Sequence, residues 1–516
     1  MASEWSERVA PDEISRYATL DTRRDKYGQP PMTIIERDPF ASATAMLRAL
    51  RERQMSAVEL LELHLGRIAR YNPILNAVVT PAFDHARQAA VAADVARARG
   101  ADDVLLGLPL TIKETLDVQG LPTTGGVPEH AHDIAGTDSP VVARVRAAGA
   151  VIMGKTNVSM RAADWQSANP LFGRTNNPWD LTRTSGGSTG GGAAGVAAGL
   201  TPLEVGSDFA GSIRIPAAFC GVYGHKPSET AVPRSGSFPR GQLPNTATAM
   251  GVQGPLARSA EDLMLALDVI AGPDIGEDVA WRLALPPPRH ECLADYRVAF
   301  LPLETMQPVD AEIATALDDL AAVLRRLGVR VEQAQPDSYG DPRDYYRLYL
   351  ALKTALMSRG RPLAERQQQA DRIRARGDNP VVGAIADGLM ASVDDYIGWF
   401  DRREQYRASY RAFFQHWDIW LAPANIVNAF PHMDRPLTLD LNGQEAPYAM
   451  QDIYPGLCNL SGHPGTAFPA ARTRSGLPIG LQAIGPYLED RTPIRFAALI
   501  AQHSGGFQAP PGYSES

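Results

Sequence analysis

Two groups of hydroxyl residues stand at opposite ends of a segment that is rich in glycine and alanine. The segment runs from Ser185 to Gly221 and reads SGGSTGGGAAGVAAGLTPLEVGSDFAGSIRIPAAFCG. Ser188 and Thr189 lie near its start, and Ser212 lies near its end, within DFAGSIRIP. Glycine inside a helix or strand lowers stability, so a segment with this many glycines is expected to have a structural or functional reason for them. A tight turn of small residues before a serine can direct successive backbone N–H groups at one point, as an oxyanion hole requires.

A serine nucleophile needs a base that removes its proton. The ten histidines include none in a recognisable triad motif, and the sequence contains no GxSxG. Lys113 lies in GLPLTIKETLDV, on or just after an apolar stretch. Burial would lower the pKa of this amine towards the range in which it accepts a proton. A lysine at a strand end more often reaches solvent, so Lys113 alone does not establish a base.

The glycines also match the GxGxxG pattern of dinucleotide-binding proteins at Gly190, Gly192 and Gly195, with Asp208 at about the spacing of an acidic ribose ligand. That pattern needs a hydrophobic strand leading into the turn, whereas the preceding residues, DLTRTSGGST, are polar. The context therefore disfavours a nucleotide-binding oxidoreductase. A second alternative is a glycine-rich connection that lets a helix pack closely on a sheet. That alternative explains Gly191, Gly192 and Gly195 but not the placement of the serines.

Alternating strands and helices are predicted along most of the chain. Apolar spacing predicts two helices in ATAMLRALRERQMSAVELLELHLGRIARYN, with Ser56 and Glu59 as a capping box, and a third over 84–99. Strands are expected in GLPLTIK and GAVIMGK, with a helix at SPVVARVRAAGA between them. This order favours parallel pairing and helices on the faces of a sheet. Further helices are expected at 193–200, in RSAEDLMLALDVIAG and over much of 340–415, and further strands in LTPLEVGSD, YRVAFLPL, WDIWLAPA and LPIGLQAIGP.

Length, composition and charge limit the class of protein. The chain has 516 residues, 44% hydrophobic and 21% charged, which is typical of a folded protein with a large core. A net charge of −8 disfavours a nucleic acid or an acidic membrane as partner. Three widely spaced cysteines and the lack of a ligand motif predict no metal and no cofactor. The first residues, MASEWSERVAPDEISRY, carry charges where a signal peptide would have its apolar core, and no apolar run approaches the ~20 residues that span a membrane, so we expect a cytoplasmic protein.

A series of motifs, taken in order, resembles the amidase signature family. The motifs are GLPLTIKE, GAVIMGKTN, NPLFGRTNNPWD, TSGGSTGGGAAGVAAGL, GSDFAGSIRIPAAFCGVYGHKPS, GPLARSAEDL and GLPIGLQAIGP. The resemblance implies an α/β amidase signature fold, with a large, mixed and mostly parallel central sheet covered by helices on both faces. Residues 1–40 are expected to form an arm and residues 41–516 a single domain. A variable, mostly helical region at about 275–415 is expected to form the substrate mouth.

Carried over by position, the resemblance assigns three catalytic side chains. Ser212 matches the nucleophile that forms an acyl-enzyme, Ser188 matches a bridging serine, and Lys113 matches a buried, neutral base. The resemblance also implies a cis peptide bond between Gly187 and Ser188. These glycines would then let the backbone place Ser188 between the other two side chains.

Further residues are expected to support this chemistry. The N–H groups expected to form the oxyanion hole are those of Phe209, Ala210, Gly211 and Ser212. Thr189 is expected to support the site, and Asp208 and Arg214 either brace the turn as a pair or face solvent. The family usually has glycine in place of Ala210 and often a smaller residue in place of Phe209. Phe209 could therefore narrow or line the acyl pocket.

The substrate class is narrowed by two features. The family includes the glutamine-hydrolysing subunit of tRNA-dependent amidotransferases, which typically has glutamine where Ile215 follows Arg214 here. A free-standing hydrolase, monomeric or homodimeric, is therefore favoured. GVYGHKPSETAVPRSGSFP and EDVAWR are most similar to aryl-acylamidase and urethanase-like members, which implies small anilide or aryl carbamate substrates and esterase side activity. The alternatives are a non-catalytic family member and an amidotransferase subunit. Apolar side chains could line the entrance or simply pack helices together: Tyr345, Tyr346, Tyr349, Leu350, Met357, Trp399 and Phe400.

Overall fold

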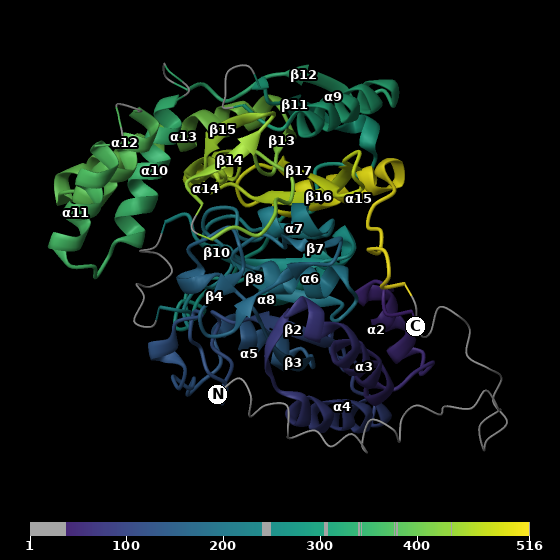
Figure 1. Ribbon diagram of the computed structural model, residues 1–516. Helices are drawn as coiled ribbons and strands as arrows, with labels where there is room; N and C mark the ends of the chain where they lie inside the picture. Colours follow the sequence, from purple (N-terminus) through teal and green to yellow (C-terminus); the bar gives the residue numbers. More distant parts are fainter. Residues whose placement is uncertain are drawn as a thin grey trace.

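An eleven-stranded mixed sheet runs through the computed structural model of the protein (Figure 1). The structure describes residues 38–239, 249–303, 308–338, 341, 343–375, 377, 380–434 and 436–514, so most of the expected arm lies outside it. Across the sheet, the strands are β1 (Val78–Pro81), β3 (Val151–Thr156), β2 (Pro109–Lys113), β8 (Leu203–Asp208), β10 (Val252–Ala257), β9 (Tyr223–Lys226), β16 (Gly465–Arg472), β17 (Pro478–Ile484), β13 (Ile419–Pro423), β11 (Arg297–Phe300) and β12 (Arg330–Gln333).

Pairing is parallel in two blocks of the sheet and antiparallel between them. β3, β2 and β8 are parallel to one another, as are β13, β11 and β12. From β8 through β10, β9, β16 and β17 to β13, each neighbouring pair is antiparallel, and β1 is antiparallel to β3. The expected large mixed sheet is confirmed, but its parallel pairs are confined to the two blocks. A short connection such as that between β16 and β17 can only join antiparallel neighbours.

Helices cover both faces of the sheet. On β9, a Cβ at Gly224 would lie 2.9 Å from Ala217 of α7 (Arg214–Cys220), so this residue faces α7. The side chain of Tyr223 alternates to the opposite face, on which α8 (Ala260–Ile270) and α15 (Arg491–Ser504) pack together. The remaining α-helices are α2 (Ala43–Arg51), α3 (Ala57–Leu75), α4 (Phe83–Ala98), α5 (Pro140–Ala147), α6 (Gly190–Ala197), α9 (Ala311–Arg326), α10 (Arg343–Met357), α11 (Leu363–Arg374), α12 (Pro380–Met390), α13 (Val393–His416) and α14 (Ile453–Ser461).

The N-terminal helices follow the predicted pattern. The α2 and α3 helices match the two predicted from apolar spacing. At the start of α3, the Glu59 N–H donates to Ser56 Oγ at 3.1 Å, and the Ser56 N–H donates to the Glu59 carboxylate at 2.8 Å. The predicted capping box is therefore confirmed.

The α6 helix begins at Gly190, three residues before the predicted start. Consecutive glycines are poor helix formers, so tertiary packing rather than propensity stabilises this first turn. A Cβ at Gly191 would lie 2.4 Å from Asn157 N, and a Cβ at Gly192 would lie 2.5 Å from Glu204 Cγ. Close helix–sheet packing therefore explains these two glycines. It does not explain Gly195, where the nearest atom is at an ordinary 3.6 Å.

The variable region divides into two parts. The α9 helix and strands β11 and β12 complete one end of the sheet, whereas α10, α11 and α12 stand out from the body at the upper left of Figure 1. Four of the apolar side chains that could have lined an entrance are buried among helices: Tyr345, Tyr346, Tyr349 and Leu350. Helix packing accounts for these four, and the role of this region as a substrate mouth stays a prediction.

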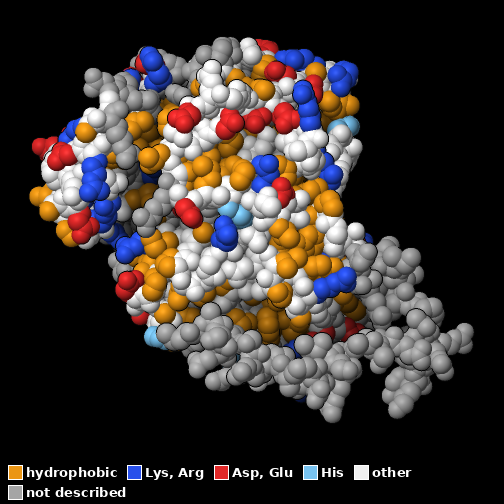
Figure 2. Space-filling model, in the orientation of Figure 1, with side chains coloured by type: hydrophobic (Ala, Val, Ile, Leu, Met, Phe, Trp, Pro, Cys, Tyr) orange, Lys and Arg blue, Asp and Glu red, His pale blue; other side chains and the backbone are white. Residues whose placement is uncertain are grey.

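The surface shows no concentration of basic side chains on the face drawn in Figure 2. Lys and Arg side chains there are scattered among Asp and Glu side chains and orange apolar patches. This distribution accords with the net charge of −8. Among the helices that the structure describes, none is both long and apolar enough to cross a membrane.

Candidate active site

Lys113 contacts Ser188 where β2, α6 and β8 adjoin, and the loop of Ser212 is joined to that of Ser188 through the backbone. Lys113 ends β2, and its Nζ lies 2.7 Å from Ser188 Oγ in the loop before α6. Thr189, the next residue, donates its N–H to the carbonyl of Ser212 at 3.1 Å, which joins the two serine loops directly. The peptide bond between Gly187 and Ser188 is cis, as the resemblance implied. Lys113 is fully buried and Ser188 is 1% exposed, whereas Ser212 is 7% exposed, so Ser212 is the more open of these two hydroxyls.

Ser207 is a contact of the lysine that the sequence analysis missed. Lys113 Nζ lies 2.9 Å from Ser207 Oγ and 3.2 Å from the Ser207 carbonyl, and Thr189 Oγ1 donates to the same carbonyl at 3.3 Å. A neutral amine has two N–H bonds and one lone pair. With three oxygens around it, one of the two hydroxyls must donate to the nitrogen, since the carbonyl can only accept. The contact depends on the pairing of β2 with β8, which sets Lys113 opposite the end of β8, and no local motif in the sequence indicated it.

Burial controls the charge of Lys113. It lowers the pKa of the amine from 10.5 to about 7, against the opposing effects of the Asp208 and Glu204 carboxylates. Glu204, also missed, is a fully buried carboxyl on β8 that accepts a hydrogen bond from Thr156 Oγ1 at 2.6 Å. Burial raises its pKa to about 7. A glutamate within the otherwise apolar strand LTPLEVG was the sequence signal for this group.

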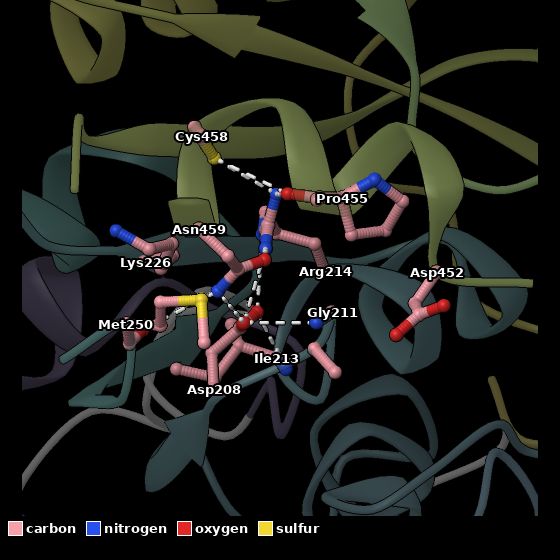
Figure 3. A network of polar contacts seen from close by, with 12 residues as sticks. Asp208, Gly211, Ile213, Arg214, Lys226, Met250, Asp452, Pro455, Cys458 and Asn459 are labelled. Atoms are coloured by element: carbon pink, nitrogen blue, oxygen red, sulfur yellow. Dashed lines mark hydrogen bonds and ion pairs between the residues drawn. The ribbon is translucent and has the colours of Figure 1, made fainter. Parts of the chain in front are cut away.

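Asp208 and Arg214 form a buried pair and do not face solvent. Arg214 donates from Nε and Nη2 to the two Asp208 oxygens at 3.0 Å each, and both side chains are fully buried. Burial alone would raise the pKa of Asp208, but the guanidinium lowers it well below its usual value. Arg214 also donates to the Pro455 carbonyl and to Asn459 Oδ1 on α14 (Figure 3). The pair therefore braces the turn against α14, as one of the two expectations had it.

The Asp208 carboxylate also accepts a hydrogen bond from one of the N–H groups that were expected to form the oxyanion hole. The Gly211 N–H donates to Asp208 Oδ1 at 2.9 Å, and the Ile213 N–H donates to Oδ2 at 3.1 Å (Figure 3). The expectation for Gly211 is thereby corrected, because its N–H is already satisfied. Three donors of the expected set then remain, and no described residue accepts a hydrogen bond from them: the N–H groups of Phe209, Ala210 and Ser212.

Position 211 requires glycine because of its backbone conformation and the lack of space for a side chain. Its φ is +89°, a conformation that side chains rarely adopt. A Cβ there would also lie 2.8 Å from Pro455 Cγ. Glycine at this position therefore lets the turn lie directly against α14.

The GxGxxG match lies outside a dinucleotide-binding context. The strand before the glycines is β7 (Asp180–Thr184), which belongs with β6 (Asn176–Asn177) to a separate two-stranded sheet and not to the large one. Asp208, the supposed ribose ligand, is paired with Arg214. Within the described ranges, no three His, Cys, Asp or Glu side chains are grouped closely enough to hold a metal ion.

Comparisons with known proteins identify the family. The sequence profile described as Amidase matches residues 59–493. An indoleacetamide hydrolase from Bradyrhizobium diazoefficiens is 33% identical over 476 residues, covering 90% of this chain and 86% of the relative. A glutamyl-tRNA(Gln) amidotransferase subunit from Roseiflexus sp. is 35% identical over 473 residues, covering 87% of this chain and 93% of the relative.

A solved structure agrees with these matches. A bacterial aryl acylamidase of the amidase signature family aligns with a TM-score of 0.76 at 26% identity, covering 92% of this chain and 99% of the other. Strand order, motif placement and these matches together show that the chain belongs to the amidase signature family of hydrolases, which act on the C–N bonds of amides.

Proposed function

We propose that the protein is a free-standing amidase that cleaves small amides, aromatic anilides and aryl carbamates among them, through an acyl-enzyme on Ser212. The observation that carries this proposal is the 2.7 Å contact between the buried Lys113 amine and the Ser188 hydroxyl. Among the described residues, the hydrogen bonds of this amine go to serine oxygens and none goes to a carboxylate. Such an amine loses its charge near neutral pH and can accept a proton.

The proton path runs through the two serines. Lys113 takes the proton of Ser188, Ser188 takes that of Ser212, and Ser212 Oγ bonds to the substrate carbonyl carbon. The negative oxygen that forms is stabilised by the free N–H groups of the turn, each worth on the order of 3 kcal/mol. As the C–N bond breaks, the proton returns through Ser188 to the leaving nitrogen. Water then attacks the Ser212 ester by the same relay and releases the acid.

An aryl carbamate would follow the same steps. Ser212 attacks the carbamate carbonyl, and the aromatic amine leaves with the returned proton. Water then releases a half-ester of carbonic acid, which decomposes to an alcohol and carbon dioxide. The machinery therefore needs no further group to accept carbamates.

An aromatic substrate is supported by what the relatives are. Both the indoleacetamide hydrolase and the aryl acylamidase are named for amides that carry an aromatic group. The second candidate, a glutamine-hydrolysing amidotransferase subunit, is favoured by the 35% identity to the Roseiflexus protein. Ile215, in place of the glutamine typical of that subunit, favours the free-standing amidase.

Chemical labelling tests the assignment of the nucleophile. The purified protein is incubated with a fluorophosphonate, digested and mapped by mass spectrometry. The adduct is expected on Ser212 and not on Ser207, because Ser212 adjoins the turn N–H groups that donate to no described residue and could hold the phosphoryl oxygen, whereas Ser207 is the partly buried hydroxyl that contacts Lys113 directly. In parallel, a p-nitroanilide, a primary arylacetamide and an aryl carbamate are offered as substrates, and release of the amine or ammonia is measured. An adduct on Ser207 instead, or turnover of glutamine alone, would contradict the proposal.

The pH profile of kcat/KM is expected to rise with pH through a midpoint near 7. Lys113 must be deprotonated to act as a base, and burial lowers its pKa to about 7. The Glu204 carboxylate opposes this lowering, so Glu204→Gln is expected to move the midpoint to lower pH. Rates with an anilide between about pH 5 and 10 would measure both profiles. A midpoint at the ordinary lysine value, about 10.4, would show that the base is not this buried amine.

A further inference from the structure

We infer that Trp165 is a positioning residue for the oxyanion turn, residues 209–212. We infer also that the segment Asp164–Gln166, the clamp segment, holds both serine loops against the C-terminal part of the chain. The inference rests on the proposed function, since it takes Ser212 as the nucleophile.

The indole of Trp165 holds one end of a peptide plane in the oxyanion turn. Its Nε1 donates to the Ala210 carbonyl at 3.3 Å. That carbonyl shares its peptide plane with the Gly211 N–H, which donates to Asp208. The plane is therefore held at both ends. Rotation of this plane would turn the adjacent N–H groups away from the carbonyl oxygen of a substrate, so its immobility pre-organises them.

The indole ring is itself held on two sides. The Tyr448 ring contacts it edge-on, with centroids 5.2 Å apart, and the Lys353 ammonium lies 5.6 Å from the centroid of its ring. Lys353 comes from α10 and forms a buried ion pair with Asp452 at the start of α14. The orientation of the indole N–H is thus fixed by Lys353 from α10 and by Tyr448 from the loop before α14.

The neighbours of Trp165 tie the clamp segment to both ends of the site. A Cβ at Gly187 would lie 2.4 Å from the Asp164 carbonyl, so the segment lies directly against the residue before Ser188. The Asp164 carboxylate accepts from Tyr448 Oη at 2.5 Å. Gln166 exchanges two hydrogen bonds with the Met433 backbone, at 2.9 and 3.0 Å. The clamp segment therefore links the serine loops to residues 433 and 448.

Trp165→Phe is the direct test, and Trp179→Phe is its matched control. Trp179 is also partly buried and donates its indole N–H to a backbone carbonyl, that of Cys220, at 2.9 Å. That carbonyl lies at the opposite end of α7 from Ser212. Each variant therefore loses one indole hydrogen bond and keeps a ring. We expect Trp165→Phe to lower kcat about tenfold with KM within about twofold, and Trp179→Phe to leave kcat unchanged.

Two further readouts separate positioning from general destabilisation. The midpoint of the pH profile is expected to stay at the wild-type value in Trp165→Phe, because the hydrogen bonds and ring contacts of Trp165 with the described residues do not involve Lys113 or Ser188. The rate of fluorophosphonate labelling is expected to fall in parallel with kcat, because the phosphoryl oxygen of the probe also needs the oxyanion donors. If Trp165→Phe fails to fold, Tyr448→Phe serves instead, with an expected fall in kcat of about threefold.

The outcomes for the inference and for the proposed function are distinct. If Trp165→Phe, or Tyr448→Phe in its place, matches Trp179→Phe in kcat and labelling rate, the inference is overturned. If Ser212→Ala keeps wild-type hydrolysis, the proposed function is contradicted, and the inference that rests on it is contradicted with it. An inactive Ser212→Ala together with an unimpaired Trp165→Phe would overturn the inference alone.

Discussion

Replacement of Ser212 by alanine is expected to lower the rate of amide hydrolysis by at least about 10⁴-fold, because the bond to the substrate carbonyl would have no oxygen to form it. Ser212 is 7% exposed and lies beside turn N–H groups that have no acceptor among the described residues. Removing its Oγ leaves those donors in place. Ser212→Ala should therefore still bind the substrate, with activity lost and affinity retained.

The measurement is single-turnover and steady-state hydrolysis of the best anilide found, with binding of the same anilide followed by calorimetry. Ser461→Ala is the control, because it removes another buried hydroxyl, one that donates to the Leu457 carbonyl within α14 at 3.2 Å. That variant should keep kcat within about threefold of the wild type. Hydrolysis by Ser212→Ala at about a tenth of the wild-type rate or more would show that the nucleophile lies elsewhere.

Many of the helices and strands could be predicted from the sequence, because their apolar residues recur with the regular spacing of each element. The capping box at Ser56 and Glu59 and the buried strands around GLPLTIK and GAVIMGK are local features, and each is found where it was predicted. The extent of antiparallel pairing was not accessible. Strand direction in the centre of the sheet depends on where β10 inserts, between β8 and β9, and no local pattern encodes that position.

In the candidate site too, contacts within known motifs could be predicted, whereas contacts that depend on distant parts of the chain could not. The contact of Lys113 with Ser188 was expected from motifs, and it is present. The Gly211 N–H is not available to a substrate because it donates to the Asp208 carboxylate. Whether that carboxylate turns back towards its own loop cannot be predicted from the presence of small residues in the motif. Trp165 escaped notice because its partner, the Ala210 carbonyl, lies 45 positions away and its orientation depends on side chains from α10 and the loop before α14.

The fate of Asp208 and Arg214 shows why two alternatives stayed open until the structure settled them. A carboxylate and a guanidinium six residues apart can pair or can both face water, and spacing alone does not decide between these arrangements. In the structure, the cost of burying both charges is offset by two direct hydrogen bonds between them and by acceptors from α14 and β17. Those acceptors come from the last part of the chain, so the sequence of the turn alone could not predict that the pair is buried.

Replacement of Lys113 by methionine is expected to reduce kcat/KM by about 10³-fold or more, because the relay through Ser188 would lose its proton acceptor. Methionine fills nearly the same buried volume without a charge. Folding should therefore survive, and the variant should lose the dependence of stability on pH that the buried amine gives the wild type. Burial lowers the pKa of the amine from 10.5 to about 7, so the folded wild type binds this proton less tightly than the unfolded chain does.

The sign of the effect on stability follows from that difference. The wild type carries the full cost of the buried amine below pH 7, and this cost shrinks as the pH rises and is gone above pH 10.5. The melting temperature of Lys113→Met relative to the wild type is therefore expected to be higher at about pH 6 than at about pH 9. Thermal unfolding at both pH values measures this difference directly.

Lys155→Met is the matched control for this experiment. Lys155 is a second fully buried lysine, on the neighbouring strand β3, and its amine donates to Thr123 Oγ1 at 2.9 Å and to the Pro122 carbonyl. Its loss should lower the melting temperature and leave kcat/KM within about fivefold of the wild type. If Lys113→Met retained activity while its stability relative to the wild type did not change between the two pH values, neither the relay nor the uncharged amine on which it depends could stand.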